Sequence, residues 1–490
     1  MKSRAIMLVV VVIVFLEGWW CNGQIVEDVA QMEISEKTVL YNSIQGFVGN
    51  WWNGSDLFPD PCGWTPIQGV TCDFMNGFWY VTDLNIGPLH DNSLNCGETP
   101  EFRPQIFEFK HLKSLSFYNC FSSNHLITLP IDNWANLGSS LESLEFRSNP
   151  SLIGPIPSTF GSLTMLQSLV LIENGMMNNL PSNIGNLRNL KRLVISGNKF
   201  TGRIPDTIGS LNELLILDLS RNSLSGQIPK SIGYLKSLIK LDLSNNLLMG
   251  NIPEDLDNLK NLTLFDLRNN NVSGGWPKSI EEMTSLQELV LSDNPIGGEI
   301  VNINCENMRN LMILDLSNTG LSGKIPNSIA MSVKLRYVGL SNNNFTGNLP
   351  YEFEKMPCVN AIYVNGNNLT GVLNFSASFY GKLRRRFKAW DNPNLCYVSE
   401  IISSGHSPFG VKPCMSVDVS GFSGSNSEVR NGSGKVQERL VWVASVAKSE
   451  KLNSDFSSSL GLLKHGNNEG VWLVFVMEFF MMIFLWSFFK

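Results

Sequence analysis

Aliphatic residues, mostly leucine, recur along this chain with a period of 24 residues. The regular restarts of the pattern lie at Leu166, Leu190, Leu214, Leu238, Leu262 and Leu286. Within the unit at residues 214–237 the apolar positions are spaced too unevenly for one long helix, yet the neighbouring units repeat the same spacing. This pattern is typical of a solenoid, because a unit that cannot bury its own leucines must stack on its neighbours to share one core.

Less regular units extend the array in both directions and bring the number of starts to twelve. They begin at Val81, Leu112, Leu141, Leu311, Leu335 and Val359. Side chains alternate between the two faces of an extended segment, so Leu217 and Leu219 are predicted to face the core while Asp218 and Ser220 face water. Stacking these segments predicts a parallel sheet.

An asparagine stands five residues after the second leucine of most units. Its amide carries two donors and an acceptor, so we expect it to turn inward and satisfy backbone groups in a turn without water. Leu89, Cys120 and Thr319 take its place in three units. The asparagines are Asn149, Asn174, Asn198, Asn222, Asn246, Asn270, Asn294, Asn343 and Asn367.

The regular units also contain an L-x-G-x-I-P segment, for example at residues 224–229. Together with the period, this segment resembles the leucine-rich repeat, and in particular its plant extracellular subtype. The resemblance implies an α/β solenoid, curved as a right-handed superhelix, with a concave parallel sheet and disulfide-braced caps. The repeats are expected over residues 81–382.

Residues 24–80 lack the repeat and are similar to the N-terminal cap of plant leucine-rich repeat proteins. The motifs that carry this resemblance are NWWN at 50–53, DPCGW at 60–64 and GVTCD at 69–73. A helical pattern of Val39, Leu40, Ile44 and Phe47 precedes them. Residues 383–414, with NPNLC at 392–396, resemble the C-terminal cap.

Nine cysteines become eight once Cys21 leaves with a signal peptide, which is an even number for an oxidising compartment. The cap resemblance implies that Cys62 pairs with Cys72 and Cys396 with Cys414. Cys96 and Cys120 form a candidate third bridge. Cys305 and Cys358 occupy different positions in units two apart and stay unassigned.

Both ends of the chain are far more apolar than its middle. Residues 1–23 carry Lys2 and Arg4, an apolar run at 5–16 and small residues before the expected cleavage point, which predicts a signal peptide. Residues 415–459 are rich in serine, glycine and asparagine and are predicted to form a stalk.

Residues 460–490 allow two interpretations. The apolar run at 471–489 is nearly long enough for a transmembrane helix, although Glu478 disfavours one. A removable signal for a glycosylphosphatidylinositol (GPI) anchor fits better, because a spacer at 460–470 separates the run from the candidate attachment residues Ser457, Ser458 and Ser459.

The charge balance and the motifs exclude several functions. With 43 acidic and 37 basic side chains, the bulk charge does not favour binding to nucleic acid. The five histidines lie in unrelated settings, and no HExxH motif, glycine-rich phosphate loop or kinase signature occurs. We therefore expect neither enzyme activity nor a cofactor or metal.

The outward positions of the concave sheet are the candidate binding surface. Asp218, Asp242, Asp266 and Asp315 are interpreted as solvated members of the common L-D-L-S form. Departures from that form bring exposed apolar side chains beside arginines, as a peptide-contacting surface requires, although scattered exposed valines are also ordinary. The candidate surface comprises Glu145, Arg147, Val170, Ile172, Glu173, Arg192, Val194 and Arg221, with Lys240, Leu264, Arg268, Tyr337 and Tyr363 beyond it.

The sharpest charge run, KLRRRFK at 382–388, lies between the last repeat and the C-terminal cap. It is predicted to be a solvated cap surface, and contact with an acidic wall polymer or a partner receptor is the alternative. Sequons for N-glycosylation occur at Asn53, Asn261, Asn271, Asn344, Asn368, Asn374 and Asn431. Asn271, Asn344 and Asn368 directly follow an inward asparagine and are the best candidates.

The whole layout resembles a plant receptor-like protein without a kinase domain. It is especially similar to the plant proteins named for insensitivity to Piriformospora indica and more distantly to the too-many-mouths type. The resemblance implies a component of the extracellular face of the plasma membrane that partners receptor-like kinases and binds a peptide or microbial ligand, as co-receptor or ligand-presenting scaffold, with the root response to a fungus as its setting. The alternatives are a secreted inhibitor of microbial wall-degrading enzymes, similar to polygalacturonase inhibitors, and structural attachment to wall polysaccharide.

Overall fold

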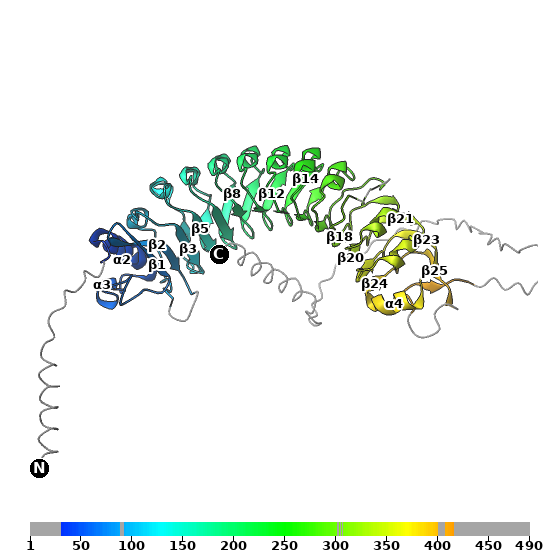
Figure 1. Ribbon diagram of the computed structural model, residues 1–490, viewed down its shortest axis with the longest axis horizontal. Helices are drawn as coiled ribbons and strands as arrows, with labels where there is room; N and C mark the ends of the chain where they lie inside the picture. Colours follow the sequence, from blue (N-terminus) through cyan, green and yellow to red (C-terminus); the bar gives the residue numbers. More distant parts are fainter. Residues whose placement is uncertain are drawn as a thin grey trace, which may run out of the picture. The chain divides into compact units, whose positions relative to one another are not determined.

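Each coil of the chain contributes one short strand to a long, nearly all-parallel sheet (Figure 1). The computed structural model describes residues 31–88, 93–300, 303, 305, 307–399 and 407–415, all within a unit that ends at Val417. Leu89, Asn431, the signal peptide, all but the first residue of the stalk, Ser457 to Ser459 and the apolar tail lie outside the described residues.

The long sheet follows the inner side of the curve in Figure 1. β1 and β2 are antiparallel, and every later pair is parallel. Leu217 is opposite Leu241, so neighbouring strands pair with an offset of one 24-residue repeat. The predicted curved solenoid with a concave parallel sheet is thereby confirmed. In order, its fourteen strands in the described part of the chain are β1 (Val70–Met75), β2 (Phe78–Ile86), β3 (Ser114–Tyr118), β5 (Ser143–Arg147), β7 (Ser168–Ile172), β9 (Arg192–Val194), β11 (Ile216–Asp218), β13 (Lys240–Asp242), β15 (Leu264–Asp266), β17 (Glu288–Val290), β18 (Ile313–Asp315), β20 (Tyr337–Gly339), β22 (Ala361–Tyr363) and β24 (Phe387–Lys388).

In most coils a second short strand follows the first, and these strands form two further sheets. In the regular coils the glycine of the L-x-G-x-I-P segment turns the chain: Gly226 has a φ of 80°, a conformation that glycine adopts without steric cost. The first of these sheets contains β4 (Ile127–Thr128), β6 (Leu152–Gly154), β8 (Gly175–Asn179), β10 (Lys199–Gly202), β12 (Ser223–Gly226), β14 (Leu247–Gly250) and β16 (Asn271–Val272). The second contains β19 (Ser322–Lys324), β21 (Asn344–Gly347), β23 (Asn368–Leu373), β25 (Asn394–Tyr397) and β26 (Lys412–Pro413).

Short 3-10 helices line the outer side of the curve (Figure 1). In the regular coils the proline of the same segment precedes the helix, as Pro229 does for η6, because its fixed φ suits a helix start. These helices are η1 (Pro104–Phe107), η2 (Trp134–Leu137), η3 (Ser158–Ser162), η4 (Ser182–Asn186), η5 (Asp206–Ser210), η6 (Lys230–Tyr234), η7 (Glu254–Asn258), η8 (Lys278–Glu282), η9 (Asn327–Met331), η10 (Tyr351–Lys355) and η11 (Arg384–Arg386).

The inward asparagines form a ladder of hydrogen bonds through the solenoid. In one coil, Asn246 Nδ2 donates to the backbone oxygens of Leu219, Leu243 and Ser244 at 3.0–3.2 Å, and Leu224 N donates to Asn246 Oδ1 at 3.0 Å. The other eight predicted asparagines make bonds of the same kind, which confirms their role. At the position of Thr319, its Oγ1 donates to the Leu316 oxygen at 2.8 Å.

The solenoid is closed at its N-terminal end by α2 (Ile34–Val48) and the short α3 (Gly54–Leu57). Val39, Leu40, Ile44 and Phe47 are all buried, which confirms the predicted helical pattern. The Phe47 ring lies 4.8 Å from that of Phe117 on β3, so the helix covers the first open coils.

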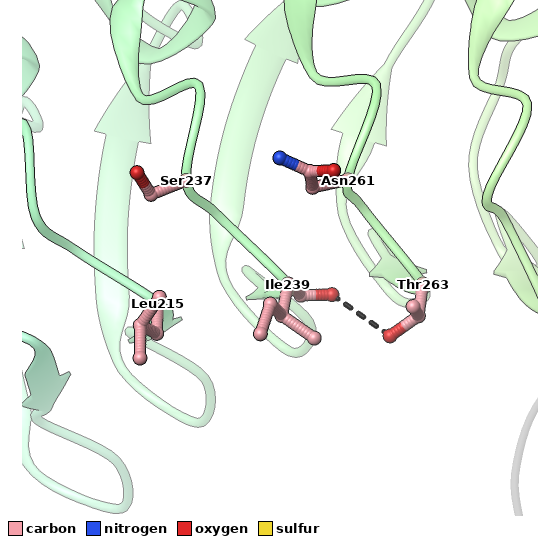
Figure 2. Close-up of a pocket in the computed structure, with 5 residues that line it drawn as sticks. All are labelled: Leu215, Ser237, Ile239, Asn261 and Thr263. Atoms are coloured by element: carbon pink, nitrogen blue, oxygen red, sulfur yellow. Dashed lines mark hydrogen bonds between the residues drawn. The ribbon is translucent and has the colours of Figure 1, made fainter.

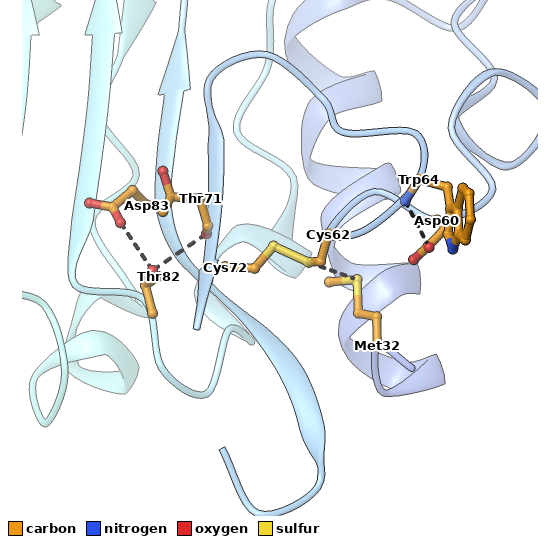
Figure 3. The surroundings of a disulfide bond; sticks show 8 residues. All are labelled: Met32, Asp60, Cys62, Trp64, Thr71, Cys72, Thr82 and Asp83. Atoms are coloured by element: carbon orange, nitrogen blue, oxygen red, sulfur yellow. Dashed lines mark hydrogen bonds between the residues drawn. A yellow bond between two sulfur atoms is a disulfide. The ribbon is translucent and has the colours of Figure 1, made fainter. Parts of the chain in front are cut away.

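Three disulfides lie near the two ends of the described part of the solenoid. Cys62 is joined to Cys72 on β1 (Figure 3), Cys96 to Cys120, and Cys396 to Cys414. These are the pairs expected from the sequence. Cys305 is buried and Cys358 is exposed, and neither forms a disulfide with a described residue.

The C-terminal end continues the repeat beyond residue 382. After α4 (Ala377–Leu383), β24 joins the long sheet. Asn392 Nδ2 donates to the oxygens of Val364 and Ala389, so Asn392 extends the asparagine ladder by one coil.

Candidate functional site

The register of the concave sheet brings the predicted surface residues onto adjacent strands. Glu145 on β5 is opposite Val170 on β7, which is opposite Val194 on β9, and Asp218 on β11 follows in the same row. Arg147 is likewise opposite Ile172, and Ser168 is opposite Arg192. The candidate residues therefore form one continuous area over three strands, which Glu173 and Arg221 extend.

Two predicted members of this area are not exposed. Val170 has none of its surface accessible and Val194 has 5%. Arg147 lies on the strand before Val170 and Arg192 on the strand after it, each diagonally across from the valine. The two guanidinium groups are close enough for their charges to interact. The prediction of exposed valines was wrong: Val170 stands between Glu145 and Val194 on the neighbouring strands, and each unit was considered alone.

The two arginines are themselves half-buried. Desolvation by burial is the main reason why the pKa of both guanidinium groups is lowered. The nearby Arg192 charge lowers the pKa of Arg147 further. Arg147 forms an ion pair with Glu145, whereas Arg192 Nε has no hydrogen-bond partner in the described part of the chain. A buried donor without a partner favours binding of an acceptor, and a guanidinium group suits a carboxylate.

Glu173 and Arg221 form an ion pair that spans two coils. Arg221 Nη1 lies 3.1 Å from Glu173 Oε1, and both side chains are about half exposed. Gly197 occupies the equivalent position in the coil between them, and a β-carbon there would lie 3.1 Å from Glu173 Cγ and 3.5 Å from Arg221 Nη2. The missing side chain of Gly197 therefore leaves room for the ion pair, a role that the sequence analysis did not assign.

The aspartates at the middle of the concave face are not solvated, which corrects the interpretation above. Asp266 is 3% exposed, and the side chains of Asp218 and Asp242 are 14% exposed. Each stands directly opposite the next across adjacent strands. In this aspartate stack (Asp218, Asp242 and Asp266) each carboxylate is covered by its neighbours one strand away, whereas the prediction treated each unit alone.

Hydrogen bonds and cations partly compensate the stack. Oδ1 of each aspartate accepts a backbone N–H two residues later, and Lys240 Nζ lies between Asp218 and Asp242 at 3.4 and 3.7 Å from their Oδ2 atoms. Arg268 pairs with Asp266 at 2.7 Å. Burial, followed by the neighbouring Asp242 charge, nevertheless raises the pKa of Asp266 to about 7, and burial with the Asp218 charge raises the pKa of Asp242.

The far end of the concave face is aromatic and cationic. The rings of Tyr337 and Tyr363 meet edge to face at 5.3 Å, and Lys388 Nζ lies 3.7 Å from the centre of the Tyr363 ring. Trp390 follows Lys388 on the same outward face, 5.9 Å from the ammonium group. Lys388 and Trp390 were not among the predicted concave residues, although Asn392 lies 25 residues after Asn367 and indicates one more coil.

A pocket of about 410 Å³ lies between three coils in the middle of the solenoid, just before β11, β13 and β15 (Figure 2). Leu215, Ile239 and Thr263 occupy equivalent positions along it, and Thr263 Oγ1 donates to the Ile239 oxygen at 3.0 Å. Asn261 also lines the pocket and belongs to a sequon. A glycan on Asn261 would therefore cover the pocket, so the concave face is the better candidate for binding.

The six sequon asparagines in the described part of the chain, at positions 53, 261, 271, 344, 368 and 374, are all exposed, and their glycosylation stays a prediction. Within the same residues, no group of three or more histidine, cysteine, aspartate or glutamate side chains is placed to hold a metal ion. The described helices are also all too short or too polar for a membrane crossing.

Comparison with known proteins agrees with the repeat architecture. Models of the leucine rich repeat match residues 188–248, 310–331 and 334–356. Among solved structures, a plant peptide hormone receptor, RGFR1 in complex with RGF2, superposes with a TM-score of 0.54 at 30% identity, covering 60% of this chain and 46% of that chain. The ectodomain of the Arabidopsis receptor kinase HAESA in complex with an IDA peptide hormone ligand gives 0.53 at 30% identity, over 60% of this chain and 48% of that chain. This chain thus spans about half the length of these receptor ectodomains.

Matches to individual plant proteins identify the family more closely than the repeat models do. Receptor like protein 29 of Arabidopsis thaliana is 37% identical over 152 residues, which is 30% of this chain and 31% of that protein. Piriformospora indica-insensitive protein 2 of Arabidopsis thaliana is 68% identical over 391 residues, which is 79% of this chain and 92% of that protein. The chain is therefore a leucine-rich repeat receptor-like protein and belongs to the family of Piriformospora indica-insensitive protein 2.

Proposed function

We propose that this protein acts at the plant cell surface as a co-receptor or ligand-presenting scaffold for receptor kinases, in the response of roots to a fungus. The observation that carries the proposal is the 68% identity to Piriformospora indica-insensitive protein 2 over 92% of that protein. The receptor ectodomains of the same fold, which are bound to peptide hormones, support a ligand-binding role for the solenoid.

The contact surface in this proposal is the concave face over β5, β7 and β9. It offers Arg192 Nε, a donor that no described residue satisfies, together with the half-buried Arg147 and the Glu173–Arg221 ion pair across Gly197. Arginine side chains bind carboxylates through two parallel hydrogen bonds, and apolar side chains beside them, such as Ile172, exclude water from the contact. An acidic group of a peptide or of a partner protein fits this area.

Affinity purification of the full-length protein from root membrane extracts, with and without fungal elicitor, tests the proposal. We expect a receptor kinase in the bound fraction. The double variant E173R/R221E keeps the net charge and the ion pair but reverses its direction, and both positions already have a positive φ of about 55°, so the backbone demands are unchanged. We expect this variant to lose the kinase.

The matched control is K260E/E282K, which reverses an ion pair of 3.4 Å whose side chains are exposed to nearly the same extent. Lys260 lies just after η7 and Glu282 ends η8, so this pair is on the outer side. It should retain the kinase. Absence of any receptor kinase from the wild-type fraction under several elicitors would contradict the proposal. Inhibition of a polygalacturonase by the purified protein would instead favour an inhibitor of wall-degrading enzymes.

We also infer that the C-terminal tail attaches the protein to the membrane after secretion. The support comes from the sequence, in which small residues at 457–459, a spacer and an apolar run follow one another as in a GPI signal. Treatment of intact cells with a phosphatidylinositol-specific phospholipase should release the protein into the medium. Retention on the membrane after this treatment would favour a transmembrane helix.

A further inference from the structure

Cationic side chains gather on the flank of the solenoid at its C-terminal end. We call Lys334, Arg336, Lys382, Arg384, Arg385 and Arg386 the cationic flank, and all six are exposed. Among the described residues, none of the six lies within ion-pair distance of a carboxylate. This surface is separate from the concave area over β5, β7 and β9.

The backbone places these cations on two coils, which are separated by the coil of β22. Asn360 N and Ala361 N donate to the Arg336 oxygen at 2.8 and 3.0 Å, and the strand that contains Ala361 pairs with β24 directly after Arg386. The flank therefore spans three neighbouring coils, or about 10 Å at the usual strand spacing of about 4.8 Å. The middle coil has the neutral Asn360 at the position of Arg336, so the positive charges form two groups, two strand spacings apart.

Neutral groups hold several of these side chains in place without neutralising them. Lys334 Nζ donates to Asn310 Oδ1 at 2.8 Å, and Lys382 Nζ donates to the Pro357 oxygen at 3.4 Å. Arg386 donates to the Asn360 side chain, and its Nη2 donates to the Lys382 oxygen at 3.1 Å. The side chains are positioned, while their charge remains available to an anion from outside.

Aromatic rings adjoin the flank on the concave side. Arg386 directly precedes β24, and Nζ of Lys388 on this strand lies 5.9 Å from the centre of the Trp390 ring. Tyr363 lies one strand away, with Lys388 Nζ 3.7 Å from the centre of its ring. Aromatic rings pack against the C–H faces of sugar rings, and guanidinium groups bind carboxylates in a bidentate manner.

We propose that the cationic flank binds a linear polysaccharide of uronic acids. Such a polymer carries one carboxylate on each sugar ring, so one chain can contact both groups of cations, which lie about 10 Å apart along the solenoid. The aromatic side chains at the edge of the flank add contacts that an acidic peptide would use less well. This binding is additional to the proposed contact with a receptor kinase and does not depend on it.

Binding of unesterified polygalacturonate to the full-length protein tests the proposal, with retention measured at increasing salt. We expect affinity to fall as salt screens the charges. The variant R384Q/R385Q/R386Q should bind about tenfold more weakly, because three exposed contacts of ordinary strength together have about that effect. Fully methyl-esterified polymer should not bind to the wild type.

The matched control is K199Q/R203Q/K230Q, which removes the same number of exposed positive charges from other coils. It should bind within about twofold of the wild type, since exposed charges far from the ligand are screened. A second variant, K334Q/R336Q, lies outside the terminal coil and should also weaken binding, which guards against a cap that fails to fold.

Three results would overturn the proposal. Equal weakening in the control variant would mean that only the bulk charge matters. Equal binding of the methyl-esterified polymer would exclude recognition of carboxylates. Competition by polyglutamate that is as strong, per carboxylate, as competition by polygalacturonate would mean that any flexible polyanion binds.

Discussion

The asparagine ladder and the aspartate stack repeat on the same coils but have opposite energetic effects. Asn246 satisfies four backbone groups while fully enclosed by the solenoid. Asp242 and Asp266, on the concave face of adjacent coils, bring like charges together in a position that water hardly reaches. One amide can donate and accept, whereas two carboxylates can only repel each other unless a proton or a cation lies between them.

The difference suggests how a repeat protein divides stability from recognition. A solenoid multiplies whatever interaction one unit makes, so an inward position must hold a side chain that complements its own copies. An outward position is free of this demand, because a nearby cation can offset the repulsion between repeated carboxylates. Lys240 does so for Asp218, and Arg268 for Asp266. Departures from the repeat therefore concentrate on the concave face, where the candidate surface lies.

The largest effect is expected from the ladder. Asn246→Ala leaves the Leu224 N–H and nearby carbonyl groups without a partner inside the solenoid, and we expect a loss of about 3 kcal/mol in the free energy of unfolding. Thermal or urea unfolding of the full-length protein measures it. The control Asn212→Ala, at an exposed position, should change stability by less than about 0.5 kcal/mol. Equal effects at the two sites would contradict the structural role of the ladder.

The aspartate stack should respond to pH in the opposite direction to an ordinary salt bridge. The folded chain raises the pKa of Asp266 from 3.8 to about 7, so it holds this proton more tightly than the unfolded chain does. Stability contributed by the bound proton is therefore present at low pH and is lost as pH rises from about 4 to about 7.

Asp266→Asn should remove this dependence. Relative to the wild type, the variant should gain about 2 to 3 kcal/mol in the free energy of unfolding between pH 5 and pH 8. Urea titrations at the two pH values measure the change. Asp206→Asn, at an exposed position, is the control and should show no such gain. If both variants follow the wild type at each pH, the stack is not desolvated as described.

A smaller effect is expected where the concave face departs from the repeat at Gly197. Gly197→Ala forces a β-carbon into a backbone with a φ of 69° and against Glu173 Cγ, so we expect a loss of about 1 to 2 kcal/mol. Gly381→Ala is the control, because nothing lies within 4 Å of the added carbon. Thermal unfolding distinguishes them, and a neutral Gly197→Ala would mean that the ion pair does not need this space.

The smallest effect concerns the ion pair itself. Glu173 and Arg221 are each 52% exposed, so a double-mutant cycle with alanine should give a coupling free energy of about 0.2 to 1 kcal/mol. The coupling should decrease in high salt. A coupling above about 2 kcal/mol would imply that the pair is desolvated and contributes to folding more than to recognition.

The inward half of each coil could be predicted from the sequence, and the outward half only in part. Leu217, Leu219 and the asparagines meet the same surroundings in every coil, so one unit predicts the others. Val170 stands instead between side chains of two other coils, and Asp266 stands opposite the carboxylate of Asp242 in the neighbouring coil. No single unit contains these contacts, which is why both exposures were predicted wrongly.

The end of the repeat was also harder to predict than its middle. Phe387, Ala389 and Asn392 follow the pattern of a further coil, but Lys388 and Trp390 replace the usual aspartate and serine between them. The three consecutive arginines before Phe387 obscured this coil. As a result, the aromatic and cationic end of the concave face became apparent only from the pairing of β22 with β24.

Hydroxyl-radical footprinting of the full-length protein, alone and with the receptor kinase that it captures, tests the concave contact most directly. Binding should reduce the labelling of Ile172 on β7 while leaving Met177 on β8 unchanged, and these two partly exposed residues belong to the same coil but to opposite sheets. Protection of Met177 with unchanged labelling of Ile172 would contradict the account.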